Sequence, residues 1–333
     1  MNAAAGRPSA RTVALLGAKV VISIGLFAWL FRRIDWSQVD SIRHARLEWL
    51  FAALGMMLAS NVLGSYQWSR LLRGAGIVLP FWKVCAYYHV GLFFNNFLPA
   101  NVGGDFARVV DAARASGSRA TSFSTVLLDR MIGTVTLAGL AVVTSLPAID
   151  HFHLGVVYAG LVVIFVVSAC LLWAIFHPRV LSTVERVLGR VGLGRLKPAL
   201  DELADRLQGF RHQRRLFMEL FIVALVVQVM RIGVHVLTAR ALGLSVPTAY
   251  FFLFVPLLAV IVSLPISLNG IGVREAAGIQ LFGLVGLSPG GAFSLQFTTY
   301  LVAVAVSLIG GVVFLVRIPH RRAEARSSRR LSE

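Results

Sequence analysis

Two short segments of this chain combine residue types that could bind an anion inside a membrane. Residues 95–108 and 263–275 each contain Leu-Pro, then an Asn and a pair of glycines, and then an Arg. In both segments the Arg follows the Pro by nine positions (108 − 99 and 274 − 265). A guanidinium group pairs with two phosphate oxygens at once, and free N–H groups at a helix N-terminus also favour an anion. The two segments therefore predict recognition of a phosphate.

Other ionisable residues lie within apolar stretches. Asp129 and Arg130 fall early in the stretch 123–146, and Arg231 and His235 lie four residues apart in another apolar stretch. Charges in the hydrocarbon region are costly, so they are usually paired or functional. Two interpretations stay open: the arginines bind a phosphate, or an acidic residue such as Asp129 or Glu275 neutralises a neighbouring arginine so that it can be buried.

The candidate substrate-binding residues are polar, charged or glycine, and lie in the two segments or at membrane depth. They are Asn95, Asn96, Asn101, Gly103, Gly104, Asp105, Arg108, Asp129, Arg130, Arg231, Asn269, Gly270, Gly272, Arg274 and Glu275, with Pro99 and Pro265 as structural breaks and Tyr66 and Gln67 as further polar contacts. No P-loop, HExxH or Rossmann fingerprint is present, so neither a cofactor nor a metal is expected. An alternative is an intramembrane transferase acting on lipid or polyprenyl phosphates, with Asp105, Asp129 or Glu275 as the base.

The elements that must position these residues are membrane helices. Of the 333 residues 57% are hydrophobic and only 14% are charged, whereas a soluble domain carries roughly a quarter charged residues. A membrane-spanning helix needs about 20 apolar residues. Stretches that meet this requirement, or come close to it, occur at 13–31, 49–66, 123–146, 154–176, 216–241 and 292–316. The sequence therefore predicts an all-α polytopic integral membrane protein with about six full spans.

The two broken segments predict re-entrant helical hairpins at about 81–108 and 250–283. Proline breaks a helix and glycine permits a turn, and such breaks survive in a membrane only when packed in protein or facing a watery cavity. Loop charges give the orientation. Residues 177–215 carry nine Lys and Arg against four acids, so this loop and the basic C-terminal tail are expected in the cytoplasm.

The first hairpin would then enter from the cytoplasm and the second from outside, as in an inverted repeat with its site near the midplane. Alternatively, the segments are two unrelated loops that both need turn residues. Whether 81–98 spans or re-enters, and on which side the N-terminus lies, stays open.

The domain organisation follows from these elements. An N-terminal tail at 1–12 precedes a transmembrane domain at 13–316, and a basic cytoplasmic tail follows at 317–333. The halves of the domain are 13–176 and 216–316, joined by an amphipathic segment at 177–215. Lys and Arg total 32 against 15 Asp and Glu. The excess lies between apolar stretches, so a nucleic-acid partner is not expected.

Three motifs in order resemble those of a known family. Phe-Leu-Pro-x-x-x-Gly-Gly-Asp-x-x-Arg at 97–108, Leu-Asp-Arg-x-x-Gly at 128–133 and Leu-Pro…Asn-Gly-x-Gly-x-Arg-Glu at 264–275 resemble the flippase-like transmembrane domain of lysylphosphatidylglycerol synthases. The resemblance implies a multi-pass protein of the plasma (inner) membrane that moves a phospholipid, expected to be anionic, between leaflets. Full synthases carry a soluble transferase domain that uses aminoacyl-tRNA, and only a short tail follows Arg317. Lysyl transfer is therefore not expected. A non-catalytic membrane partner of a separate biosynthetic enzyme is a further alternative, and no oligomeric state is assigned.

Overall fold

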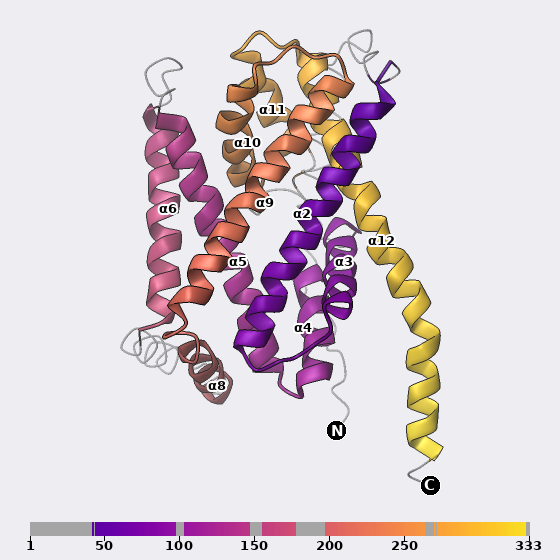
Figure 1. Ribbon diagram of the computed structural model, residues 1–333. Coiled ribbons are helices and arrows are strands. Elements are labelled where there is room, and N and C mark those ends of the chain that lie inside the picture. Colours follow the sequence, from indigo (N-terminus) through magenta and orange to yellow (C-terminus); the bar gives the residue numbers. More distant parts are fainter. Residues whose placement is uncertain are drawn as a thin grey trace, which may run out of the picture.

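The computed structural model describes residues 42, 44–97, 103–146, 155–177, 197–263, 270 and 272–330, and every regular element in them is helical (Figure 1). The predicted span at 13–31 lies outside these residues. So do four of the residues singled out in the two breaks, namely Pro99, Asn101, Pro265 and Asn269.

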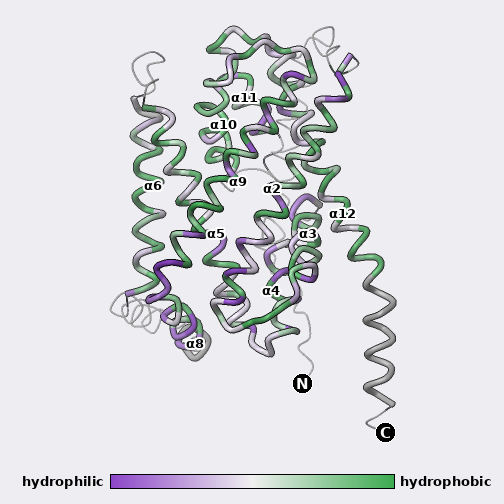
Figure 2. Tube along the Cα trace, viewed as in Figure 1, coloured by the Kyte–Doolittle hydropathy of each residue, from purple (hydrophilic) through white to green (hydrophobic). Residues whose placement is uncertain are grey.

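Five of the described helices are long and apolar enough to cross a membrane. They are α2 (Leu47–Gly74), α5 (Arg119–Ser145), α6 (Gly155–Ile175), α9 (Arg214–Ala241) and α12 (Pro289–Arg330), the last being apolar as far as Val316. Figure 2 shows apolar residues along most of α6 and the membrane part of α12. Large apolar side chains such as Leu171 and Val312 are exposed on these helices, as expected where the surrounding solvent is lipid. The chain is therefore a polytopic membrane protein, as predicted.

Two pairs of shorter helices form the hairpins. Helices α3 (Phe81–Phe97) and α4 (Gly103–Ser116) pack on each other, and so do α10 (Thr248–Ser263) and α11 (Val273–Gly283). Each helix has fewer residues than the roughly 20 needed to cross the hydrocarbon. Figure 1 places the α3–α4 pair in the lower half of the molecule and the α10–α11 pair in the upper half. The two hairpins therefore enter from opposite faces, and 81–97 turns back instead of spanning.

The order of the helices repeats. Helices α2 to α5 run long, short, short, long, and α9 to α12 repeat this order. The interval in the sequence between the starts of α2 and α9 (214 − 47) equals the interval between the starts of α3 and α10 (248 − 81). The contacts correspond as well, because α3 packs on α4 and α12 while α10 packs on α11 and α5. Opposite entry combined with equivalent contacts makes this an inverted repeat, with the antiparallel pair α2 and α9 at its centre.

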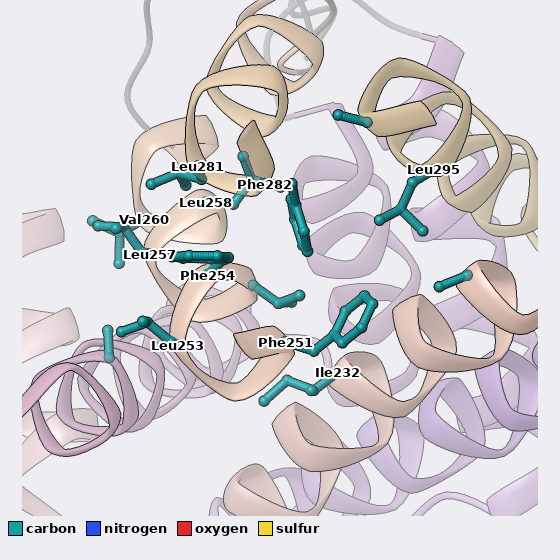
Figure 3. Close-up of a cluster of buried hydrophobic side chains, with 14 of the residues drawn as sticks. Ile232, Phe251, Leu253, Phe254, Leu257, Leu258, Val260, Leu281, Phe282 and Leu295 are labelled. Carbon is teal, nitrogen blue, oxygen red and sulfur yellow. The ribbon is translucent and has the colours of Figure 1, made fainter. Parts of the chain in front are cut away.

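The second hairpin is held by an apolar cluster, shown in Figure 3. Phe251 and Phe254 of α10 meet Phe282 of α11 at ring-centroid distances of 5.4 and 5.3 Å. Ile232 of α9 and Leu295 of α12 belong to the same buried cluster. Aromatic pairs at this spacing add to the packing in favourable edge-on or tilted geometry. The α10–α11 hairpin is thus anchored to both long helices of its own repeat.

Helix α8 (Lys197–Gln208) forms part of the predicted amphipathic segment 177–215 and lies between the two repeats in the sequence. Leu207, and Phe210 just after the helix, are buried in a cluster with Leu128 of α5 and Leu220 of α9, whereas the charged side chain of Glu202 is exposed. Helix α8, the α3–α4 hairpin and the C-terminal end of α12 all lie at the same end of the molecule (Figure 1).

Helices α3 and α12 approach closely at a glycine. A Cβ placed on Gly310 of α12 would collide with the backbone of His89 and Val90 in α3, and those atoms cannot rotate away. Membrane helices use small residues in this way to bring their backbones together.

We expect Gly310→Ala to lower the free energy of unfolding by about 1–3 kcal/mol, the usual cost of overpacking. Thermal unfolding of the purified protein in detergent measures the change. The matched control is Gly160→Ala in α6, where a Cβ meets no atom within 4 Å. That variant should be unchanged or up to about 1 kcal/mol more stable, because alanine favours a helix. Equal behaviour of the two variants would show that the α3–α12 contact is not tight.

Candidate functional site

A polar cavity of about 250 Å³ lies between helices of both repeats. Its walls come from α2, α3, α4, α5 and α9, and Ser263 at the end of α10 completes the lining. The polar and charged side chains among the lining residues are Gln67, Tyr88, Asn95, Arg108, Asp129, Arg130, Thr134, Gln228, Arg231 and Ser263. Five of the predicted substrate-binding residues (Asn95, Arg108, Asp129, Arg130 and Arg231) and the predicted polar contact Gln67 thus meet around one space.

Arg108 is fixed in the wall of this cavity. Its Nη2 donates to Asp129 Oδ2 at 2.7 Å, and Gln67 Nε2 donates to the other carboxylate oxygen at 2.9 Å. The guanidinium carbon lies 4.3 Å from the ring centroid of Trp68 and 4.7 Å from that of Tyr88, which is within cation–π range. The Arg108 side chain is only 4% exposed. It is therefore held by α2, α3 and α5 together and cannot move freely toward a ligand.

Arg130 is held differently. Its Nε and Nη2 donate to the two oxygens of Asp105 at 2.7 and 2.8 Å, and its side chain is 50% exposed. Asp105 lies in the first turn of α4, so this ion pair ties the returning helix of the hairpin to α5. One of the two interpretations left open was that Asp129 neutralises a neighbouring arginine, and it does so for the buried Arg108 but not for its chain neighbour Arg130. Asp129 pairs with Arg108 instead, because residues adjacent on a helix point in different directions.

Arg231 of α9 lines the same cavity. Among the described residues no carboxylate lies within ion-pair distance of its guanidinium, although its carbonyl oxygen accepts from His235 Nδ1 at 3.0 Å. Three described arginines line the cavity, and two of them are paired: Arg108 with Asp129 in the lining, and Arg130 with Asp105 outside it. One positive charge is left in excess. In a medium of low dielectric constant, one uncompensated cation strongly favours an anion.

The start of α4 is capped by a polar side chain of α3. The Gly104 N–H donates to Asn95 Oδ1 at 2.9 Å, which satisfies a free donor at the start of α4. A Cβ on Gly104 would collide with the carbonyl oxygen of Gly91 in α3, so glycine is needed for this contact. Gly103 begins α4, and Asn96 is half-buried on α3 without lining the cavity.

The predicted residues of the second hairpin lie elsewhere. Arg274 stacks on the ring of Tyr300 in α12 at 4.7 Å, and Glu275 is buried and accepts from the Gly272 N–H at 2.7 Å. Gly270 and Gly272 have φ values of 75° and 81°, which favour glycine. None of these four residues lines the cavity. Contrary to the prediction, Arg274 does not join Arg108 and Arg130 in the lining of this cavity. The arginine that the second repeat contributes to the lining is Arg231.

Tyr66 lies outside the cavity, although the sequence suggested it as a polar contact of the site. Its hydroxyl donates to Glu219 at 2.7 Å, and Arg70 donates to both oxygens of Glu219 at 2.8 Å. This cluster links α2 to α9.

Sequence reasoning missed four polar residues of the lining, namely Tyr88, Thr134, Gln228 and Ser263, and also Trp68, whose ring packs on Arg108. An adjacent polar residue, Gln67, was the only signal near Trp68, and aromatic residues in an apolar helix are usually core residues.

The fold and the cavity define a polytopic helical membrane protein in which two inverted repeats enclose a net-positive polar site. The chain belongs to the family described as the lysylphosphatidylglycerol synthase TM region, which it matches over residues 17–311. It is also similar to a UPF0104 membrane protein of Pyrococcus horikoshii, with 24% identity over 324 residues that cover 90% of this chain and 95% of that protein. The resemblance seen in the sequence motifs is thereby confirmed at the level of the family.

Proposed function

We propose that this protein is a lipid flippase or a transporter of a lipid-linked substrate, and that the cavity receives the phosphate of the headgroup. Arg231 carries the proposal, because it faces the cavity at membrane depth without a carboxylate partner among the described residues. A charge left in this state is expensive unless it serves a ligand. Arg130, half exposed in the same cavity, supplies a planar pair of N–H donors suited to phosphate oxygens.

The size of the cavity supports a headgroup and not a whole lipid. The cavity measures about 250 Å³. One water molecule takes up about 30 Å³ of liquid water. The space therefore holds several waters, which is room for a phosphate and a few attached atoms. The acyl chains would stay in the surrounding bilayer, where the exposed apolar faces of the long helices meet them. A headgroup in this cavity would cross the membrane without leaving its charge in hydrocarbon.

The inverted repeat supports a transport cycle. Hairpins that enter from opposite faces can exchange roles when the two repeats rock against each other, so that a central site opens first to one leaflet and then to the other. The end that carries α8 and the C-terminal tail is also the basic end, and the positive-inside bias assigns it to the cytoplasm of the plasma membrane. Anionic phospholipids are then the expected partners.

The intramembrane transferase is less well supported by the geometry. Its candidate bases Asp105 and Asp129 each accept short hydrogen bonds from arginine, at 2.7–2.8 Å. Both carboxylates are therefore held by arginine and not directed at a substrate. Glu275 accepts from the backbone of Gly272, just before its own helix, and does not line the cavity.

Reconstitution in liposomes tests the proposal. Purified protein would be placed in vesicles containing a trace of fluorescent phosphatidylglycerol, and a membrane-impermeant reductant would bleach the outer-leaflet probe. We expect bleaching to proceed beyond half of the probe, since lipid from the inner leaflet keeps arriving. Bleaching that stops at half, as in protein-free vesicles, would contradict a passive flippase. Product formed from a lipid phosphate would instead favour the transferase.

A further inference from the structure

The ion pair between Asp105 and Arg130 has the geometry of a bound anion. Two parallel N–H groups of Arg130 reach two oxygens of one carboxylate at 2.7 and 2.8 Å, as they would reach two oxygens of a phosphate. Arg130 is also the more exposed partner, with 50% of its side chain accessible against 20% for Asp105. An anion entering the cavity therefore finds the donors of Arg130 accessible but already occupied.

Asp105 has a second cation within reach. Arg108 Nη1 lies 3.7 Å from Asp105 Oδ1. This separation is too long for a hydrogen bond but close enough for an ion pair. Arg108 also retains a buried Nε that has no hydrogen-bond partner among the described residues. Since Arg108 is fixed by Asp129 and by the Trp68 ring, it can receive Asp105 without moving. Asp105 can therefore leave Arg130 and still have a cation beside it. Without that cation, the desolvated carboxylate would be too unstable for the exchange to occur.

We propose that Asp105 is a built-in competitor for the ligand: it holds Arg130 when the cavity is empty and shifts to Arg108 when a phosphate binds between Arg130 and Arg231. This inference rests on the proposed function, since it assigns to the same cavity the group that regulates its occupation. The ligand class is a phosphate anion, either free inorganic phosphate or the phosphate ester of a lipid headgroup.

The exchange links binding to the hairpin. Asp105 lies in the first turn of α4, and its pair with Arg130 is one of the contacts that tie α4 to α5. The adjacent Gly104 donates to Asn95 and packs directly on Gly91 of α3. When a ligand takes Arg130, the first turn of α4 loses this ion pair with α5 but keeps its contacts with α3 and the Arg108–Asp129 ion pair one turn further along. The first hairpin would then be free to tilt about the Arg108–Asp129 contact, a motion of the kind that alternating access requires.

Binding measurements with a double-mutant cycle test this exchange. Wild type, Asp105→Asn, Arg130→Gln and the double variant would be titrated in detergent with inorganic phosphate and, separately, with dihexanoyl phosphatidylglycerol. We expect Asp105→Asn to tighten binding on the order of tenfold, because the ligand no longer displaces a carboxylate. In the Arg130→Gln background the same substitution should change binding less than about twofold, since no donor remains to be released.

The cycle separates exchange from a general effect of charge. Removing any nearby negative charge attracts an anion, and that effect would persist without Arg130. Equal tightening in both backgrounds, or none in either, would overturn the exchange. If the wild type binds neither probe, that result contradicts the proposed function itself. The probe that binds more tightly shows whether a free phosphate or a lipid headgroup is the source of the anion.

Discussion

Replacing Arg231 with glutamine is expected to reduce the movement of fluorescent phosphatidylglycerol in liposomes at least about tenfold. Arg231 supplies the cavity's excess positive charge. A charged hydrogen bond to a buried phosphate contributes about 1.5–3 kcal/mol. Glutamine keeps a polar side chain but is two bonds shorter, so the change removes the charge together with the reach of the guanidinium. The rate of bleaching beyond half of the probe gives the measurement.

Arg240→Gln provides the control. Arg240 lies on the same helix and carries the same charge, but its guanidinium stacks on Trp49 at 5.2 Å and does not line the cavity. This variant should keep close to the wild-type rate. If both variants move the probe as fast as the wild type, the cavity is not the route of an anionic headgroup.

Replacing Asp129 with alanine is expected to lower the free energy of unfolding by about 3–5 kcal/mol, which is the usual result of removing one partner of a buried ion pair. Arg108 would keep its cation–π contacts with Trp68 and Tyr88 but lose its hydrogen-bonded carboxylate. Gln67 would lose its acceptor at the same time. The loss appears as a lower midpoint of thermal unfolding in detergent.

A paired variant shows whether the uncompensated charge is the cause. Arg108→Met combined with Asp129→Leu removes both charges and keeps roughly the same volume. Such replacements of buried ion pairs are often neutral for stability. We therefore expect the double variant to recover most of the stability that Asp129→Ala loses. Because it lacks Arg108, it has no second cation to receive Asp105 when phosphate binds. A double variant as unstable as Asp129→Ala would point to packing instead of charge.

The spans could be predicted because hydropathy is a local property. A helix in lipid satisfies its backbone within the segment, so a long apolar stretch such as 216–241 is enough to predict α9 (Arg214–Ala241). The hairpins followed from equally local signals, proline and glycine within a few positions. The repeat was predicted from the two breaks alone, whereas the matching order of four helices in each repeat appeared only in the structure.

The site was predicted in part. Asn95, Arg108, Asp129, Arg130 and Arg231 do meet, because buried charges have few reasons to exist other than pairing or binding. The pairing itself was not predicted. Asp129 serves Arg108, and Asp105 serves Arg130, since the partner of a charge is decided by which helix faces meet and not by which residues are adjacent.

The sequence by itself determined that this chain spans a membrane, where its helices break, and that arginines and aspartates lie at membrane depth. These are properties of single segments in a fixed solvent, the hydrocarbon of the bilayer. Only the tertiary structure decided which charges are cancelled and which remain. It placed Arg274 against Tyr300 and left Arg231 facing the cavity, because an ion pair depends on distances between helices far apart in the sequence.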